Sequence, residues 1–176
     1  MEFADEFVQR FRWIDGHADM LSLFTDGAFL RRTAEALASP FKSARVTKVA
    51  GVEARGFILG TAVSLQLDAG FVAIRKHGAI HPGPKATVRA TPDWRGNQPE
   101  LALQRQAITT NDQVLLVDDW IETGSQALAA RQLIEECGGT WTGLSVLVDQ
   151  SKPAKGQDLD PVASVVTFDA LPPSVA

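Results

Sequence analysis

The sequence predicts an α/β fold with a mostly parallel central sheet flanked by helices. Short apolar segments typical of strands alternate with segments of helical periodicity, which is the pattern of consecutive βαβ units. The 176 residues suit a single domain, 1–176, that is large enough to bury a complete core. Hydrophobic residues make up 45% and charged residues 22%, an ordinary globular composition without repeats or low-complexity segments.

The first half of the chain holds the first predicted strands and helices. Residues 1–25 have a mixed pattern, in which WIDGHAD indicates an irregular stretch. A helix is predicted over about 27–38, because apolar residues recur there at helical spacing and a proline follows. RVTKVAGVEARGF indicates a strand near 46–50, a loop, and a helix that begins around Gly56. GFVAIRK indicates the next strand, near 71–75.

The second half begins with a long segment, 76–100, that is dense in glycine and proline. A loop of this length in a compact domain is usually a functional lid or a disordered segment. Part of it, KATVRAT, also fits a strand or a hairpin arm. The alternation then resumes, with a strand predicted over 114–118, a helix over 124–137 that two glycines stop, and a strand over 141–148.

Charge and cysteine content exclude several classes of protein. A formal net charge of -4 argues against a broad nucleic-acid-binding face. Cys137 is the only cysteine, so no internal disulfide can form, and its apolar surroundings indicate a buried structural thiol. No apolar run approaches the roughly 20 residues of a membrane span, and the charged N-terminus lacks the apolar core of a signal peptide. We therefore expect a cytoplasmic protein whose partners are neither nucleic acid nor membrane.

The segment VLLVDDWIETGSQ places two acids between a buried strand and the start of a helix. A helix N-terminus attracts anions, and here Thr123 and Ser125 add hydroxyl groups while Gly124 lets an anion approach the backbone. Asp118 and Asp119 would repel a phosphate at that turn unless they bind another part of the same ligand. Carboxylates only accept hydrogen bonds, so the hydroxyls of a ribose would satisfy them. The pattern predicts a site for a ribose 5-phosphate unit; the alternative is that the acids merely cap the helix.

Two motifs resemble those of a known family. VLLVDDWIETGSQ resembles the signature of type I phosphoribosyltransferases, and VAGVEARGFILGTAVSLQLDAGFVAIRKHG resembles the adenine phosphoribosyltransferase pattern G-[IV]-E-[SA]-R-G-F followed by V-x-[IV]-R-K-x-G. The two motifs occur in the expected order and lie within about residues 46–148. The resemblance implies a transferase of nucleotide salvage that moves ribose 5-phosphate from phosphoribosyl pyrophosphate to a purine-like base, with adenine as the favoured acceptor and pyrophosphate as the second product.

The resemblance also assigns roles to residues. Asp118 and Asp119 would hold the ribose hydroxyls. The turn that would wrap the 5-phosphate consists of Glu122, Thr123, Gly124, Ser125 and Gln126. The residues that would bind pyrophosphate are Glu53, Ala54, Arg55, Gly56, Arg75 and Lys76. Mg²⁺ would accompany the pyrophosphate and be held mainly by substrate oxygens and water, so no protein metal site is predicted.

In the family, the segment corresponding to 76–100 is a mobile catalytic lid that excludes water from an oxocarbenium-like transition state. Arg55 and Lys76 would supply positive charge near the leaving group, and Lys85 and Arg89 are further candidates. Asp93, in PDWRG, would accept the proton of the base. The alternative for the cations is simple solvation, and for Asp93 a role in a turn.

The sequence departs from the family pattern at two places. Glu122 stands where a small residue is usual, and a carboxylate beside a phosphate is unfavourable unless it points away. Ser125 and Gln126 also replace the usual residues of the turn. The N-terminal hood, 1–26, lacks the usual F-P-x-P-G segment, so that Trp13, His17 and Asp19 would shape a different base pocket or else serve the structure alone.

These departures leave two alternatives to the purine enzyme. One is a non-catalytic protein of the same fold that senses the phosphoribosyl donor or a nucleotide. The other is a phosphoribosyltransferase with a non-purine acceptor, such as a pyrimidine. The resemblance further implies a homodimer.

Overall fold

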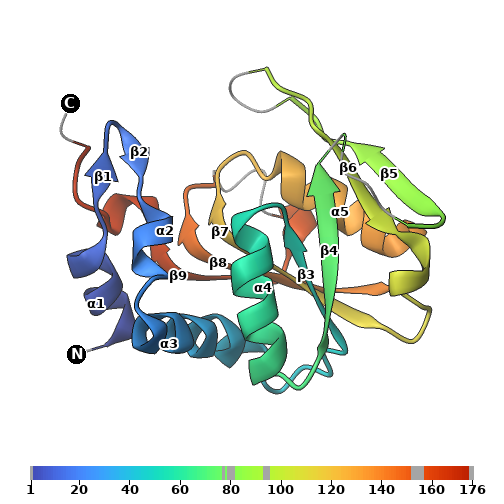
Figure 1. Ribbon diagram of the computed structural model, residues 1–176, viewed down its shortest axis with the longest axis horizontal. Coiled ribbons are helices and arrows are strands. Elements are labelled where there is room, and N and C mark those ends of the chain that lie inside the picture. The colour runs from blue at the N-terminus through green and yellow to red at the C-terminus, as the bar shows by residue number, and fades with distance from the viewer. Residues whose placement is uncertain (1, 77, 79–81, 93–95, 152–156, 175–176) are drawn as a thin grey trace.

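The computed structural model of the chain describes residues 2–76, 78, 82–92, 96–151 and 157–174. A seven-stranded sheet with the order β5-β6-β4-β3-β7-β8-β9 forms its centre (Figure 1). The five parallel strands are β3 (Lys48–Val52), β4 (Gly70–Lys76), β7 (Gln113–Ile121), β8 (Thr140–Asp149) and β9 (Val162–Thr167). A hairpin of β5 (Lys85–Arg89) and β6 (Glu100–Gln104) adds the antiparallel edge beside β4. The predicted α/β fold is confirmed, and KATVRAT does contribute a strand.

Helices cover both faces of the sheet (Figure 1). On one face lie α3 (Gly27–Ala38) and α4 (Arg55–Gln66), which pack against the apolar side chains of β3 and β7. On the other face α5 (Ser125–Glu136) buries Leu133 and Ile134 in a second cluster, against β7 and the β5–β6 hairpin. Short 3-10 turns complete the fold at Ser39–Phe41, Arg105–Ala107, Gln157–Leu159 and Phe168–Ala170. Both apolar layers are closed, as a parallel sheet requires.

The N-terminal region is more ordered than the sequence suggested. It contains α1 (Phe3–Arg10), a hairpin of β1 (Trp13–Ile14) and β2 (His17–Ala18), and α2 (Met20–Leu23). The hairpin turns at Asp15 and Gly16, whose φ angles of 48° and 72° are both positive, as a type I′ turn needs. The interpretation of WIDGHAD as irregular was wrong, because two-residue strands are too short to produce a periodic pattern.

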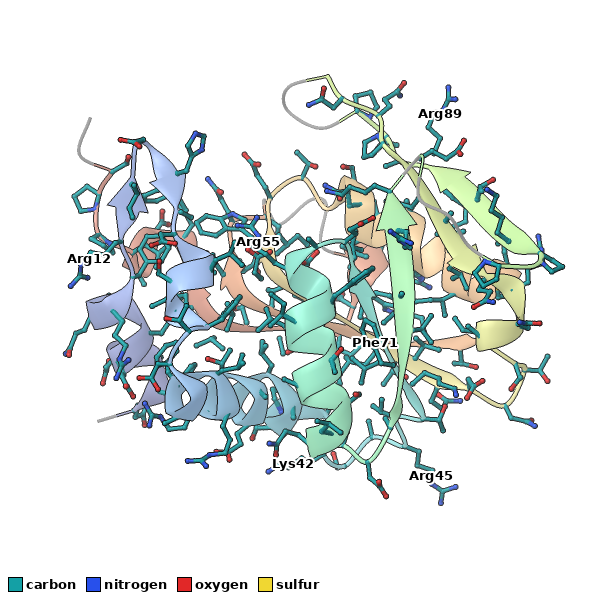
Figure 2. The ribbon with its side chains drawn as sticks, in the orientation of Figure 1. Arg12, Lys42, Arg45, Arg55, Phe71 and Arg89 are labelled. Atoms are coloured by element: carbon teal, nitrogen blue, oxygen red, sulfur yellow. The ribbon has the colours of Figure 1, made fainter. Side chains whose placement is uncertain are left out.

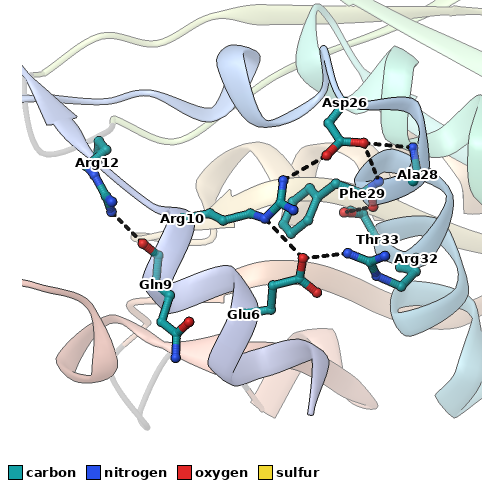
Figure 3. A network of polar contacts seen from close by, with 9 residues as sticks. All are labelled: Glu6, Gln9, Arg10, Arg12, Asp26, Ala28, Phe29, Arg32 and Thr33. Atoms are coloured by element: carbon teal, nitrogen blue, oxygen red, sulfur yellow. Dashed lines mark hydrogen bonds and ion pairs between the residues drawn. The ribbon is translucent and has the colours of Figure 1, made fainter. Parts of the chain in front are cut away.

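A polar network fixes this hood to the rest of the domain (Figure 3). The Arg10 guanidinium donates to Asp26 at 2.8 Å and pairs with Glu6 at 3.0 Å, and Arg32 pairs with the same Glu6 at 2.5 Å. Asp26 also caps α3 by accepting hydrogen bonds from its first backbone N–H groups. The hydrogen bond from Arg10 is the main reason that the pKa of Asp26 lies below its ordinary value. The network therefore ties α1 to the start of α3.

Strand β7 is longer than predicted and has acids at both ends. It continues to Ile121, so that Asp118 lies inside the strand, opposite Val146 of β8. Just before the strand, Asp112 is buried and accepts hydrogen bonds from Thr47 Oγ1 at 2.8 Å and from the Thr109 backbone N–H and Oγ1 at 2.8 and 2.9 Å. Burial by itself raises the pKa of Asp112, but these hydrogen bonds and the charge of Lys48 together hold it below the ordinary value.

Two remaining expectations concern the thiol of Cys137 and membrane-spanning helices. Cys137 is a free, half-buried cysteine that packs against the core cluster around α5, and burial raises the pKa of its thiol. Across the described ranges, no helix is long and apolar enough to cross a membrane.

Candidate active site

A cleft of about 460 Å³ opens at the C-terminal ends of β3 and β7. Two segments far apart in the sequence meet there, the loop after β3 and the end of β7 with the turn that follows it. The predicted residues on its wall are Glu53, Ala54, Arg55, Lys76, Asp118, Asp119, Glu122, Thr123, Gly124, Ser125 and Gln126. The carboxyl edge of a parallel sheet is where ligands of such folds bind. The structure therefore brings together most of the residues that the sequence nominated.

The loop after β3 is positioned by two glycines in backbone contact. A Cβ atom on Gly51 would lie 2.0 Å from the Gly56 carbonyl oxygen. A Cβ atom on Gly56 would lie 3.2 Å from the Val117 carbonyl oxygen and 3.3 Å from Asp118 Oδ1. The absence of side chains thus lets α4 begin directly against β3 and β7, and Gly56 itself is buried beneath the loop. This close approach brings Arg55 to the acidic pair.

The acidic pair is crowded and partly buried. Asp119 is 4% exposed, and its Oδ2 lies 2.9 Å from Nε of Arg55. Asp118 is half-buried, and its Oδ1 accepts a hydrogen bond of 2.9 Å from the Asp119 backbone N–H. Burial, and next the negative charge of Asp119, raise the pKa of Asp118 well above its ordinary value of 3.8. Two adjacent acids held in this way favour a ligand that brings hydrogen-bond donors to them.

The turn after β7 forms another part of the cleft wall. Gly124 has φ 73°, and it caps α5 while its neighbours Thr123 and Ser125 share a hydrogen bond of 3.1 Å between their hydroxyl oxygens. The Ser125 backbone N–H reaches Thr123 Oγ1 at 3.4 Å. Leu159 packs so closely below the turn that a Cβ on Gly124 would lie 3.3 Å from its Cδ1. The first N–H groups of α5 thereby face a small, firmly supported concavity of the kind that binds phosphate.

Comparison with known proteins agrees with this geometry. The family model of the phosphoribosyl transferase domain matches residues 21–169. The chain belongs to the phosphoribosyltransferase family. Curated relatives are the adenine phosphoribosyltransferases of Maricaulis maris, 36% identical over 86% of this chain and 87% of the relative, and of Bradyrhizobium sp., 38% identical over 86% and 85%.

Solved structures of the same family show the same architecture. The adenine phosphoribosyltransferase of Rhodothermus marinus superposes with a TM-score of 0.83 at 30% identity, over 94% of this chain and 98% of that one. The enzyme of Giardia lamblia, in complex with 9-deazaadenine, also gives a TM-score of 0.83, at 29% identity over 95% and 98%.

The pyrophosphate side of this phosphoribosyltransferase differs in part from the expectation. Glu53 pairs with Arg75 at 3.5 Å and accepts a hydrogen bond of 3.2 Å from the Lys76 backbone N–H, whereas Arg55 pairs with Asp119. Glu53 and Arg55 therefore have separate partners. Lys76 lines the cleft, but Arg75 lies beside it and Gly56 beneath it. Glu53 orients the end of β4 and thereby places Lys76.

Of the predicted lid, 76–100, the described structure places Lys76 and Asn97 on the cleft wall. Asp93 lies outside the described residues, as do His77 and His81. Asn97, which no sequence pattern identified, lines the cleft. Lys85 and Arg89 are exposed at the two ends of β5 and lie apart from the cleft wall; Figure 2 shows Arg89 on the hairpin, far from Arg55 at the start of α4.

A second cavity, of about 550 Å³, lies between the cleft and the hood. Its aromatic wall consists of Trp13, Trp120 and Phe168, whose ring centroids are 5.8–6.4 Å apart in edge-to-face arrangements. Trp13 Nε1 donates to the Pro172 carbonyl oxygen at 2.7 Å, and Trp120 Nε1 donates to Gln150 Oε1 at 2.8 Å. These hydrogen bonds fix both indoles, so that the hood cavity has a rigid apolar side.

The hood cavity is also the region where sequence reasoning missed most. Trp13 and His17 line it as one of the alternatives expected, but Asp19 instead caps α2 by accepting from the Ser22 N–H at 3.2 Å. Residues that no motif identified complete the wall, namely Trp120, Gln150, Phe168, Asp169, Leu171 and Pro172. The signal available in the sequence was the tryptophan inside VLLVDDWIETGSQ, a large aromatic residue directly after the acidic pair.

Proposed function

We propose that the protein transfers ribose 5-phosphate from phosphoribosyl pyrophosphate to adenine and releases pyrophosphate, a reaction of purine salvage. The observation that supports this most strongly is the cleft itself, in which an acidic pair and a helix-capping turn line the same space of about 460 Å³. Relatives with 36% and 38% identity over most of the chain are adenine phosphoribosyltransferases.

The donor would lie across the cleft. Asp118 and Asp119 would accept hydrogen bonds from the ribose hydroxyls, while the 5-phosphate would bind the N–H groups and hydroxyls of the turn from Thr123 to Gln126. Arg55 would leave Asp119 and bind pyrophosphate oxygens, because its planar guanidinium group can donate two parallel hydrogen bonds to them. Lys76 would add a second positive charge to the leaving group.

A magnesium ion fits this arrangement only as a companion of the donor. Among the described residues no group of three or more His, Cys, Asp or Glu side chains could hold a metal ion. Mg²⁺ favours oxygen ligands and retains water, so substrate oxygens would hold most of its coordination shell, near Asp118 and Asp119. Bound there, the ion would neutralise charge on the pyrophosphate.

The acceptor base would occupy the hood cavity. Trp13, Trp120 and Phe168 offer a planar heterocycle an aromatic wall, and the relative from Giardia lamblia was solved with 9-deazaadenine. Asp93, the proton acceptor that the resemblance implied, lies outside the described residues.

A homodimer in the cytoplasm completes the proposal. The solvent side of α4 exposes Ile58 and Leu65, with 39% and 79% of their surface accessible. These residues are seven positions apart and so lie on one face of the helix. Size-exclusion chromatography with light scattering would return the mass of two chains, and the mass of one chain would contradict the dimer.

The decisive test is a release assay. The protein is incubated with phosphoribosyl pyrophosphate, Mg²⁺ and one of several bases, such as adenine, hypoxanthine, guanine, uracil or orotate, and pyrophosphate is measured. We expect the fastest release with adenine. Fastest release with another base would assign a different acceptor, and donor binding without any release would favour the sensor alternative.

A further inference from the structure

Among the described residues, three line both the cleft and the hood cavity: Arg55, Trp120 and Glu122. If the donor ribose lies in the first space and the acceptor base in the second, the bond between them must form at this boundary. The inference below rests on that proposed function. Of the three boundary residues, Arg55 is a permanent cation and Trp120 is apolar apart from an N–H that Gln150 already accepts. Glu122 is therefore the only boundary residue that can accept a proton.

The other acids of the cleft have contacts within the protein, and the proposed donor site uses Asp118 and Asp119 for the ribose hydroxyls. Asp119 pairs with Arg55, Asp118 accepts from the Asp119 N–H, and Glu53 pairs with Arg75. Glu122 is exposed, and within the described part of the chain no hydrogen bond or ion pair holds its carboxylate. Its oxygens are thus available to a ligand that offers an N–H group.

The position of Glu122 also selects which ligand group it can meet. The residue directly precedes Thr123, so a 5-phosphate in the turn would repel its carboxylate. Because Glu122 also lines the hood cavity, its carboxylate can avoid this repulsion by turning toward the proposed base. A nucleobase offers N–H donors there, and a carboxylate accepts such hydrogen bonds strongly.

We propose that Glu122 contacts the acceptor base and removes its proton during transfer. The ring nitrogen uses its electron pair to bond to C1 of the ribose, and the C1–oxygen bond breaks with its electron pair leaving on pyrophosphate. The proton of the base passes to a Glu122 carboxylate oxygen. The base thus enters as a neutral N–H acid, and the products are the nucleotide, pyrophosphate and protonated Glu122, which returns its proton to solvent.

Several other ionisable groups line the two cavities that Glu122 lines. From the neighbouring elements, the ionisable residues that line the same two cavities are Arg55 of α4, His17 of β2, Asp118 and Asp119 of β7, Asp169 of the 3-10 turn, and Glu53 and Lys76 at the far side of the cleft. Because several ionisable groups line these cavities, a pH profile of the unaltered protein alone would not identify Glu122. Variants are therefore needed.

The test compares Glu122→Gln and Glu122→Asp with a matched control, Glu35→Gln, which alters an exposed glutamate on α3. Single-turnover rates with adenine are measured against pH, and donor affinity is measured by calorimetry with phosphoribosyl pyrophosphate and Mg²⁺. We expect Glu122→Gln to lower the rate about 100-fold, as loss of a general base does. Its donor affinity should stay within about twofold of the unaltered protein.

The pH profile separates a chemical role from a structural one. The unaltered protein and Glu122→Asp should lose activity as the carboxylate becomes protonated at low pH, and Glu122→Gln should lack this limb. A Glu122→Gln variant as fast as Glu35→Gln would overturn the inference alone, and so would a parallel loss of donor affinity, which would assign Glu122 to the phosphate turn. Absence of release from the unaltered protein with every base would overturn the proposed function, and this inference with it.

Discussion

Strand β7 carries buried carboxylates at both ends, and their surroundings are opposite. Asp112, before the strand, accepts three hydrogen bonds from Thr47 and Thr109, and its pKa lies below the ordinary value. Asp118, near the other end, is raised in pKa by burial and by the charge of Asp119. The protein supplies Asp112 with three donors, whereas the proposed ligand would supply further donors to the acidic pair. The partners of a carboxylate, more than its burial, therefore distinguish a structural acid from a binding acid.

The largest effect, on donor affinity, should come from removing the charges of Asp118 and Asp119 near the C-terminal end of β7. In Asp118→Asn with Asp119→Asn, two charged acceptors for the ribose hydroxyls are lost, each worth about 1.5–3 kcal/mol. Affinity for phosphoribosyl pyrophosphate with Mg²⁺ should fall by at least about 100-fold in calorimetry, while the circular dichroism spectrum stays that of the folded protein. An unchanged heat of binding would contradict the role of the pair.

The substitution of Asp by Asn at Asp112, just before β7, should lower stability and leave donor affinity unchanged. Asp112→Asn places an NH₂ group against donors, and the unsatisfied groups should cost about 2 kcal/mol of unfolding free energy. For a chain of this size that is a fall in Tm of about 4–8 °C, with donor affinity unchanged. Asp68→Asn is the matched control, since Asp68 is exposed and its φ of 52° suits asparagine. Equal melting temperatures for the two variants would refute the contrast.

A smaller effect on ligand affinity is expected at Thr123, in the turn that follows β7. Thr123→Ala removes one hydroxyl donor to the 5-phosphate and should weaken binding of ribose 5-phosphate about tenfold. Binding of ribose without the phosphate should stay the same. Equal losses for the two sugars in parallel titrations would show that Thr123 supports the cleft as a whole.

The smallest effect, and the sharpest in sign, is the pH dependence of stability. Asp118 has a raised pKa, so the folded state holds its proton more tightly, and stability falls as pH rises above the ordinary value of 3.8. Asp112 has a lowered pKa, so its contribution is present above 3.8 and is lost as pH falls below it. In thermal melts, the stability of Asp118→Asn relative to the unaltered protein should rise as pH increases from about 4 to 7, whereas the deficit of Asp112→Asn should shrink as pH falls below about 4. If melting temperature changed with pH in the same way for the two variants, the predicted opposite pKa shifts of Asp118 and Asp112 would be refuted.

The sequence identified most of the residues that line the cleft because they fall within short local motifs. The acids, the glycine turn and the start of α5 fall within VLLVDDWIETGSQ, and the loop before α4 falls within GVEARGF. The parallel sheet then brings the two strand ends to one edge. The hood cavity could not be predicted in this way, because Trp13, Trp120 and Phe168 come from three distant segments and meet only through tertiary packing.

Two errors of detail have physical causes as well. The predicted end of β7 was too early, because an acidic pair looks like a strand terminus although β8 continues to pair with Trp120 and Ile121. Strands β6 and β9 were not anticipated: β6 lies at the end of a segment dominated by loop signals, and β9 follows a stretch of prolines and charged residues.

The contact between Gly51 and Gly56 has a consequence for how such a protein can diversify. Because backbone without side chains on both sides sets where α4 starts, this part of the cleft floor cannot vary, and random libraries at these two positions should return glycine alone. The hood-cavity residues Trp13, Glu122 and Phe168 have no such restriction. If the proposed function holds, new acceptors could therefore be selected by exchanging these side chains while the proposed pentose site stays unchanged.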